Sequence, residues 1–349
     1  MMEKYLTFKE INHLFNTNFK GRAITGASID TRTLKKGNIF FAIKGSNTDG
    51  HKFLSEAYKK GASIAFVNKK VIGYKIPQIK VKNTSQALLQ LAKTYRSILK
   101  TEIIGITGSV GKTGTKDAIN YLLRNQKDIY CSRKSYNNQY GLPVEILNMP
   151  RQTKYGFFEI GMNHTGEIKR LVKVLQPQTA IILNIESVHI GNFNSLKEIA
   201  FAKSEIFTST KSIENLIINK SSNFYHLLYR LSKNTKIKNI FDFGKDKDAK
   251  IHLKKQYIKK NIIYNQIILP DKNELNIKLL HNQKNLILNT LAIITCFYAL
   301  GLDLKLIKQF KDVPFSDGRG NIIKSNFNGR KIEIFDHSYN ASPVSMKDT

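Results

Sequence analysis

The segment from Glu102 to Ala118 constrains the fold more than any other part of this chain. It opens with a short apolar run rich in β-branched residues, Ile103 to Ile106, which is typical of a buried strand. Three glycines within and after this run allow the backbone to bend so tightly that successive N–H groups can point at one anion. We expect a helix to begin near Lys112 and to aim the positive end of its dipole at the same point. The segment therefore predicts a phosphate-binding turn between a strand and a helix.

The side chains of this turn suit a nucleoside triphosphate with a magnesium ion. Lys112 supplies a cation for the β- and γ-phosphates, and the hydroxyl of Thr113 can ligate magnesium. The turn departs from the pattern G-x-x-x-x-G-K-[ST], because Ile106 stands where the first glycine is expected. A glycine-rich turn without a ligand is the structural alternative. The predicted nucleotide-binding residues here are Thr107, Gly108, Ser109, Val110, Gly111, Lys112 and Thr113.

Length and composition indicate a globular protein of two to three domains. The chain has 349 residues, of which 41% are hydrophobic, and only seven prolines. Its two cysteines, Cys131 and Cys296, lie far apart and predict neither a disulfide framework nor a zinc site. The amino terminus lacks a signal-peptide cleavage site, and no apolar run approaches the roughly 20 residues that cross a bilayer. We expect a cytoplasmic protein with no membrane partner.

The formal net charge of +30 admits two interpretations. A basic surface attracts phosphates at long range, as nucleic-acid-binding proteins require. The alternative is a compositional bias in which lysines are spread over all solvated faces. The lysines here are scattered and no nucleic-acid motif is present, so we favour the compositional interpretation and expect no nucleic-acid partner.

Apolar strands alternate with helical segments through most of the chain, which predicts an α/β fold. We expect a small α/β domain over residues 1–82 and a central P-loop domain with a parallel sheet over 83–312. Residues 313–349 would begin a Rossmann-like third domain, of which we expect only the opening strand, Lys331 to Asp336. In a parallel sheet the ligand lies at the carboxyl ends of the strands.

Two polar residues follow apolar strands and are candidates for a metal site beside Thr113. Glu159 ends the strand at 157–159, and His189 lies just beyond the strand at 180–185. Because the carboxyl ends of neighbouring parallel strands converge on the P-loop, both side chains are expected near the magnesium ion. Taken singly, Glu159 is equally a capping or surface carboxylate, and His189 a loop histidine. Their matching strand-end positions favour the metal site.

These clusters, in their order along the chain, resemble the Mur ligases of peptidoglycan synthesis. The resemblance covers essentially the whole chain and rests on eight amino-terminal and central motifs and one near the carboxyl terminus. These are S-x-D-[ST]-R at 28–32, D-G-H at 49–51, T-G-x-x-G-K-T at 107–113, N-N-x-x-G-x-P at 137–143, E-x-G-x-N-H-x-G-E-I at 159–168, N-I-x-x-x-H at 184–189, A-K-x-E-I-F at 202–207, H-N-x-x-N at 281–285, and Y-N-A-S-P at 339–343. The E-x-G-x-N-H-x-G-E and S-Y-N-A pieces are typical of the branch that adds D-alanyl-D-alanine.

The resemblance implies roles for individual residues. Lys112 would bind ATP, Asn138 would lie near the acyl phosphate, and Thr113, Glu159 and His189 would hold Mg²⁺. Lys203 stands where several relatives carry a carbamylated lysine that ligates a second magnesium ion. Asn282 and Asn285 would lie near the adenine, and Arg319 would reach the ATP phosphates. The residues that would meet the UDP-sugar are Ser28, Asp30, Thr31, Arg32, Asp49, Gly50 and His51.

The implied reaction is the ATP-dependent ligation of D-alanyl-D-alanine to UDP-N-acetylmuramoyl-tripeptide through an acyl phosphate, by a monomer. Residues 1–82 would then bind the UDP-sugar and 83–312 would bind ATP. The chain departs from the pattern at His337, where a second acidic residue is usual, and at Gly114, where threonine is usual. The third domain would continue past the Y-N-A motif, so the alternative expectation is a truncated, inactive fragment that binds nucleotide or UDP-sugar.

Overall fold

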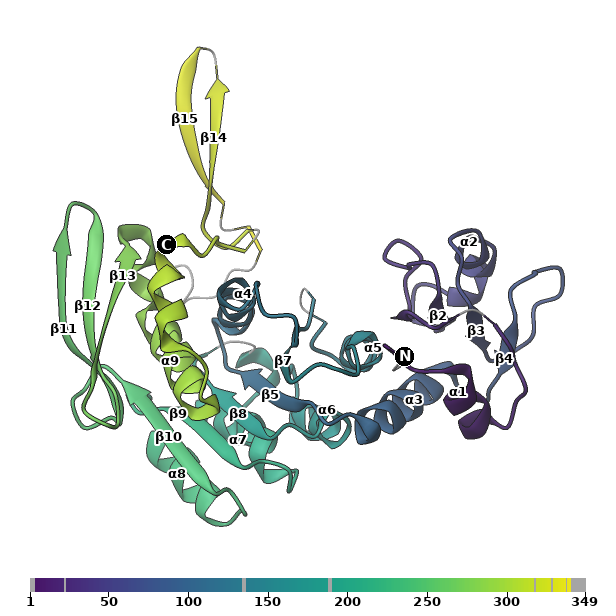
Figure 1. Cartoon of the computed structure of the whole chain (residues 1–349), viewed down its shortest axis with the longest axis horizontal. Coiled ribbons are helices and arrows are strands. Elements are labelled where there is room, and N and C mark those ends of the chain that lie inside the picture. The colour runs from purple at the N-terminus through teal and green to yellow at the C-terminus, as the bar shows by residue number, and fades with distance from the viewer. Residues whose placement is uncertain are drawn as a thin grey trace.

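The computed structural model describes residues 4–21, 23–133, 136–187, 190–316, 318–327, 329–336 and 338–339. Near the amino terminus, a four-stranded parallel sheet has the order β1-β2-β3-β4. Its strands are β1 (Gly26–Ser28), β2 (Asn38–Phe41), β3 (Ile64–Val67) and β4 (Gln78–Lys80). The helices around it are α1 (Phe8–Phe15), η1 (Gly50–Phe53) and α2 (Leu54–Lys59), and α3 (Thr84–Ile98) leads out of it (Figure 1).

A nine-stranded sheet forms the centre of the described structure, in the order β13-β12-β11-β10-β9-β8-β5-β7-β6. The pairs from β6 to β11 are parallel, and β12 and β13 continue the sheet antiparallel. The strands are β5 (Glu102–Thr107), β6 (Ile129–Cys131), β7 (Tyr155–Glu159), β8 (Thr179–Ile182), β9 (Asn215–Asn219), β10 (Asn239–Gly244), β11 (Ile251–Lys259), β12 (Ile262–Ile268) and β13 (Glu274–Leu280). Since β7 and β8 flank β5 on opposite sides, the strand order reverses at β5, where a ligand crevice is expected.

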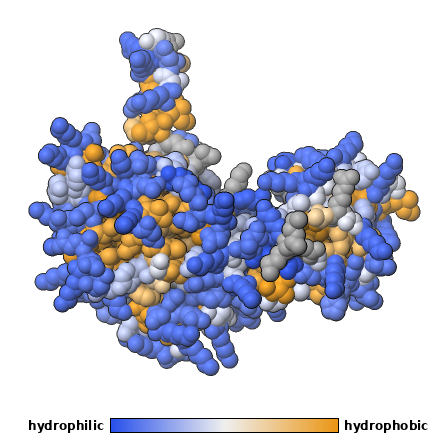
Figure 2. All heavy atoms as spheres, viewed as in Figure 1, coloured by the Kyte–Doolittle hydropathy of each residue, from blue (hydrophilic) through white to orange (hydrophobic). Residues whose placement is uncertain are grey.

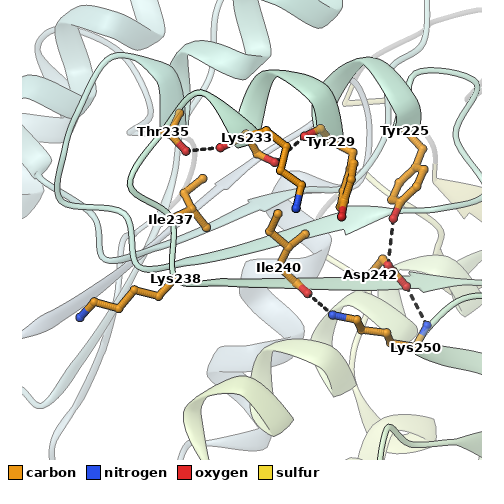
Figure 3. Close-up of a pocket in the computed structure, with 10 residues that line it drawn as sticks. Tyr225, Tyr229, Lys233, Thr235, Ile237, Lys238, Ile240, Asp242 and Lys250 are labelled. Atoms are coloured by element: carbon orange, nitrogen blue, oxygen red, sulfur yellow. Dashed lines mark hydrogen bonds between the residues drawn. The ribbon is translucent and has the colours of Figure 1, made fainter.

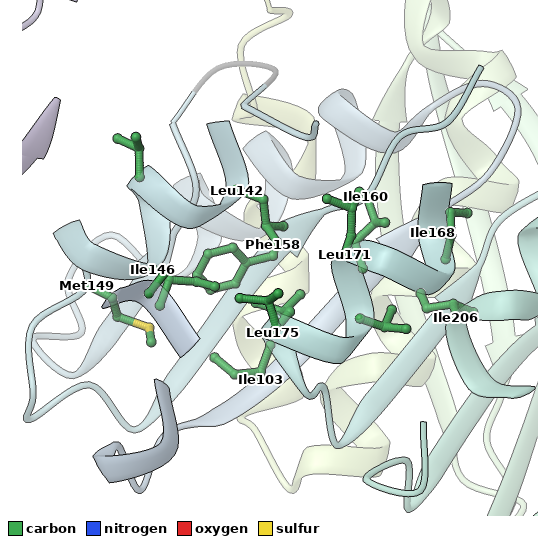
Figure 4. Close-up of a cluster of buried hydrophobic side chains, with 14 of the residues drawn as sticks. Ile103, Leu142, Ile146, Met149, Phe158, Ile160, Ile168, Leu171, Leu175 and Ile206 are labelled. Carbon is green, nitrogen blue, oxygen red and sulfur yellow. The ribbon is translucent and has the colours of Figure 1, made fainter. Parts of the chain in front are cut away.

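Helices cover both faces of this sheet and bury its central strands. One face carries α3, α5 (Gly141–Asn148), α6 (Glu167–Leu175), α7 (Leu196–Thr208) and α8 (Tyr225–Lys233). The other carries α4 (Lys112–Leu122), α9 (Ile287–Leu300) and the 3₁₀ segments η3 (His281–Leu286) and η4 (Leu304–Asp312); η2 (Ile190–Asn192) precedes α7. Successive strand residues face opposite cores: Phe158 packs with α5 and α6, as Figure 4 shows, whereas Phe157 packs with α4. This double burial fixes the carboxyl end of β5.

A two-stranded antiparallel hairpin follows, made of β14 (Asn321–Phe327) and β15 (Arg330–Asp336). It projects from the rest of the chain, and Figure 2 shows apolar side chains gathered on it. Phe327 and Phe335 are 65% and 60% exposed. The sequence-based expectation of a single strand here was incomplete, because β14 had not been predicted. The domain boundaries at 82 and 312 stay a prediction. Within the described residues, no helix combines the length and apolar character needed to cross a bilayer.

Candidate functional site

The turn between β5 and α4 has a backbone that only glycine adopts easily. Gly111 precedes α4 with φ +83°, in the left-handed region. A Cβ atom at this position would also lie 2.6 Å from Nδ2 of Asn289 on α9, so the Asn289 side chain would have to move. The backbone conformation therefore favours glycine here, at the point where α4 begins beyond the carboxyl end of β5.

A second loop, after β8, braces this turn. Asn184 accepts a hydrogen bond from Val110 N at 2.9 Å and donates one to Val110 O at 3.1 Å. The hydroxyl of Ser109 donates to Glu186 O at 3.0 Å and accepts from Glu186 N at 2.8 Å. With the bond from Ser109 N to Asn184 O at 3.1 Å, five hydrogen bonds join this loop to the phosphate-binding turn.

The ammonium group of Lys112 lies over the turn. It donates to the carbonyl oxygens of Gly108 at 2.8 Å and Ser109 at 3.1 Å. Burial lowers the pKa of Lys112, and the nearby carboxylate of Glu159 partly offsets that effect. The lysine is thus a cation at the mouth of the turn, where the outer phosphates of a nucleotide would add negative charge.

Glu159 ends β7 and is almost fully buried beside the turn. Its carboxylate accepts a hydrogen bond from the hydroxyl of Thr113 at 2.7 Å and another from Nδ2 of Asn137 at 2.7 Å. Nη2 of Arg319 donates to the same Thr113 hydroxyl at 3.2 Å. The structure therefore brings Thr113, Glu159 and Arg319 together, and all three come from different parts of the chain.

Two further residues, His189 and Lys203, are candidates for the predicted metal site, and the structure describes only the second. His189 lies outside the described residues, so its role stays a prediction. Lys203 is buried on α7, and the described part of the chain holds no hydrogen-bond partner for its ammonium group. Burial, with a smaller effect of the positive charge of Lys112, lowers the pKa of Lys203 well below its usual value. Its carbamylation stays a prediction.

The adjacent amide side chains of the loop after β6, Asn137 and Asn138, make different hydrogen bonds. Asn138 is exposed, and its side-chain oxygen accepts the N–H groups of Tyr140 and Gly141 where α5 begins. Asn137 reaches Glu159 instead. The loop is anchored by the fully buried Glu145, whose carboxylate accepts hydrogen bonds from the backbone and guanidinium of Arg133 and from the hydroxyl of Tyr130.

The predicted nucleotide contacts outside the turn come from two segments. Asn282 and Asn285 are exposed on η3, one turn before α9. Arg319 lies in the segment that leads to β14, and its guanidinium carbon sits 3.9 Å from the ring centre of Tyr339. This stacking holds the guanidinium over Thr113.

The predicted sugar-binding loops lie at the first sheet. Ser28 and Asp30 close a tight turn, and the guanidinium of Arg32, 86% exposed, pairs with Asp30 at 2.7 Å. Asp49 binds Nδ1 of the buried His51 at 2.6 Å, and Nε2 of His51 accepts the N–H of Asn68. Both ring nitrogens of His51 are used inside the protein, so Arg32 is the better placed of these side chains to reach a ligand. The roles of both loops stay predictions, as do those of Thr31, which accepts from Lys60, and Gly50, which packs on Ile43.

Comparison with known proteins agrees with this geometry. The Mur ligase middle domain matches residues 106–297, and the catalytic domain of the Mur ligase family matches residues 23–96. The chain belongs to the Mur ligase family. The UDP-N-acetylmuramoyl-tripeptide–D-alanyl-D-alanine ligase of Rickettsia prowazekii is 37% identical over 320 residues, which cover 91% of this chain and 70% of that protein. The same-named ligase of a Buchnera aphidicola strain from Acyrthosiphon pisum is 33% identical, covering 98% and 74%.

Solved Mur ligases share the fold. MurF from Acinetobacter baumannii superposes with a TM-score of 0.82 at 26% identity, covering 99% of this chain and 76% of that one. MurF from Thermotoga maritima, solved in complex with ADP, superposes with a TM-score of 0.73 at 26% identity, covering 93% and 73%. The predicted α/β fold and the predicted family are therefore confirmed.

Several residues of this Mur ligase site were missing from the sequence-based list. Asn137 was passed over in favour of its neighbour, although the pair of amides was noted. Asn184 was predicted only as part of a motif, and no role was predicted for Asn289 of α9. Their signal was the concentration of asparagines at strand ends and at the start of α9, which marks polar groups where an apolar pattern stops.

Proposed function

We propose that this Mur ligase joins D-alanyl-D-alanine to UDP-N-acetylmuramoyl-tripeptide, using ATP, in the synthesis of peptidoglycan precursors. A carboxylate is a poor acyl donor, so ATP first phosphorylates it, and the amine then displaces phosphate through a tetrahedral intermediate. The names of the relatives support these substrates. The observation that carries the proposal is the convergence of Lys112, Thr113, Glu159 and Arg319 at the carboxyl end of β5.

Each of these side chains suits a step in which negative charge gathers. Lys112 and Arg319 present cations toward the position of the transferred phosphoryl group. Asn138, at the start of α5, would lie near the acyl phosphate, with Asn282 and Asn285 near the adenine. Thr107 to Val110 would line the phosphates through the backbone that Asn184 and Glu186 brace. Positioning and electrostatics therefore do most of the work.

The pair Thr113 and Glu159 fits a magnesium ion. The Thr113 hydroxyl lies 2.7 Å from the Glu159 carboxylate. Adjacent ligands of an octahedral ion with bonds of about 2.1 Å lie roughly 3 Å apart, so a small opening of this hydrogen bond would admit the ion. Mg²⁺ bound there would neutralise phosphate charge. His189 is proposed as a further ligand, and Lys203 as a residue whose neutral, unprotonated amine could accept carbon dioxide.

The proposed substrates divide the chain into working parts. Residues 1–82 would bind the UDP-sugar, with Ser28 to Arg32 and Asp49 to His51 facing it. Residues 83–312 would bind ATP and magnesium, and 313–349 would begin the ligase's third domain. Substrates linked to nucleotides support a cytoplasmic location and a reaction that needs neither a membrane nor a nucleic acid. That the chain works as a monomer stays a prediction.

The proposal is tested by measuring phosphate release from ATP and Mg²⁺ with each substrate present or omitted. We expect release to require both the UDP-linked tripeptide and D-alanyl-D-alanine. Glu159→Gln should lower the rate about 10²- to 10³-fold, because a neutral amide would hold Mg²⁺ less tightly and the ion would neutralise less of the phosphoryl charge. The exposed carboxylate of Glu274, replaced in Glu274→Gln, serves as the control and should leave the rate unchanged.

Two outcomes would overturn this assignment. Release that does not depend on the dipeptide would remove the ligase reaction. ATP binding without turnover, measured by calorimetry, would favour a module that only binds nucleotide.

A further inference from the structure

A groove of about 350 Å³ lies between α8 and β10. Figure 3 shows Tyr225, Tyr229 and Lys233 of α8 on one side of it and Ile240 and Asp242 of β10 on the other. The loop from Thr235 to Lys238 closes one end. In the sheet, β9 and β8 separate β10 from β5, so the groove is distinct from the nucleotide-binding turn. Its volume is at the lower end of the range for small-molecule sites.

The groove exists because the first half of β10 has an open edge. The pairing of β11 with β10 begins at Phe243, opposite Ile251. Before that point, Lys250 caps the edge by donating its ammonium to the carbonyl oxygen of Ile240 at 2.6 Å. Its remaining ammonium hydrogens have no carboxylate within ion-pair distance among the described residues.

Two further donors in the groove are unused. The ammonium of Lys233 lies 4.7 Å from the ring centre of Tyr229, and the described residues offer it no ion pair. The hydroxyl of Tyr229 likewise has no hydrogen-bond partner in the described part of the chain. Figure 3 shows both groups in the space between α8 and β10. Because Tyr225 stacks on one face of the Tyr229 ring and Lys233 covers it as well, the ring is poorly placed to stack on a ligand.

The nearby carboxylates already have hydrogen-bond or ion-pair partners. Asp242 accepts hydrogen bonds from the hydroxyl of Tyr225 at 3.0 Å and from Lys250 N at 2.7 Å. Glu214, outside the groove, pairs with Lys238 at 2.9 Å. Besides the Asp242 carboxylate, the groove offers unused hydrogen-bond donors, and the three lysines that line it outnumber that carboxylate and make its charge positive.

We propose that this groove binds the phosphate group of a small molecule. The donors, Tyr229 and Lys233 on α8 and Lys250 beyond β10, come from separate points of the groove lining and do not form the planar fork that pairs with a carboxylate. A tetrahedral dianion offers acceptors in those separate directions. The partly buried side chains of Ile237 and Ile240 leave room for a short carbon body, so both inorganic phosphate and a small phosphate monoester fit the site.

The experiment must remove phosphate binding by the nucleotide-binding turn. We would titrate the Lys112→Ala chain with inorganic phosphate and, separately, with glycerol 3-phosphate by calorimetry at fixed ionic strength. Acetate serves as the carboxylate probe. On this background, Tyr229→Phe with Lys233→Met removes the two unused donors, and Lys236→Met removes an exposed lysine that does not line the groove. Thermal unfolding checks that each variant is folded.

We expect saturable binding of phosphate or the monoester and weaker binding of acetate. The double variant should bind phosphate or the monoester at least about tenfold more weakly, since hydrogen bonds to a charged group are lost. Lys236→Met should leave this affinity unchanged. Tighter binding of glycerol 3-phosphate would identify a monoester as the ligand, and equal binding would identify the free ion. The proposal fails if the Lys112→Ala chain binds neither probe, or if the double variant binds as well as the control.

Discussion

The carboxyl end of β5 and the segment that leads into the β14–β15 hairpin both supply side chains to the phosphate-binding turn, but they are held in opposite ways. β5 is buried on both faces, between α4 on one side and α6 and α7 on the other. The hairpin contacts the rest of the described chain mainly through polar groups near its base, and its apolar side chains are exposed. Ser316 donates to Asp117 at 2.5 Å, and Arg319 donates to Thr113 at 3.2 Å.

This contrast separates two parts of one site. The turn with Lys112 is held by packing and by the five hydrogen bonds that join Ser109 and Val110 to Asn184 and Glu186. Arg319, by contrast, depends on a few polar contacts that can open at low cost. We infer that the first part sets the position of the phosphates and the second part determines how completely their charge is neutralised.

The largest effect is expected from the rigid part. Lys112→Ala should lower the rate of phosphate release by about 10³-fold, because the cation nearest the transferred group is lost from a fixed position. Thermal unfolding should be little changed, since Lys112 bonds only to carbonyls of its own turn. Lys93→Ala, at an exposed position on α3, is the control. A loss below about tenfold would mean that the turn does not hold the reacting phosphate.

A matched pair of phenylalanines tests the contrast in packing. Phe158→Ala on β7 should lower the free energy of unfolding by about 3–5 kcal/mol, because it leaves a cavity in the core. Phe335→Ala on β15 removes the same group from a side chain that is 60% exposed, so it should change stability by less than about 1 kcal/mol. Urea unfolding of both variants provides the measurement. Equal losses would show that the hairpin is packed against something in solution.

The difference between these regions also explains what the sequence could predict. β5, the turn and Glu159 were predictable, because apolar runs indicate the strands and the carboxyl ends of neighbouring parallel strands meet at the same edge of the sheet. The choice between Asn137 and Asn138 was not, since the direction of a side chain in a loop depends on local dihedral angles that two identical residue types do not reveal. Asn289 was hidden for a similar reason: its neighbour in space, Gly111, is distant in sequence.

The strand β14 was not predicted because its own sequence lacks a strand pattern. β14 reads Asn-Ile-Ile-Lys-Ser-Asn-Phe, which has no regular alternation of apolar and polar residues. Alternation arises where one face of a strand packs on a core, and the exposed side chains of β14 show that neither face does so in the described structure.

The segment that leads to the hairpin should give the next largest effect. Arg319→Ala should lower the turnover rate about 10²-fold, and Arg319→Lys should restore only part of it, since lysine cannot both stack on Tyr339 and donate to Thr113. The Michaelis constant for ATP is expected to change less than the turnover rate, because Lys112 and the turn still bind the nucleotide. Arg330→Ala, at an exposed position on β15, is the control. A full rescue by lysine would argue for charge alone.

The smallest effect, on stability, is expected at Lys203, and it depends on pH. Burial lowers the pKa of this lysine well below the value of the unfolded chain. Between the two pKa values the unfolded chain binds more protons than the folded one, so the contribution of Lys203 to stability rises with pH in that window. Below the folded pKa the cost of burying the cation is fully present. Lys203→Met should therefore be more stable than the parent chain at neutral pH, and this gain should shrink as the pH approaches the ordinary pKa of lysine. Urea unfolding across that range measures the gain, with Lys197→Met, exposed on the same helix, as the control. A gain that does not vary with pH would show that the packing of the Lys203 side chain, and not its buried charge, sets the cost of Lys203 to stability. In that case only packing would link Lys203 to the rigid part of the site.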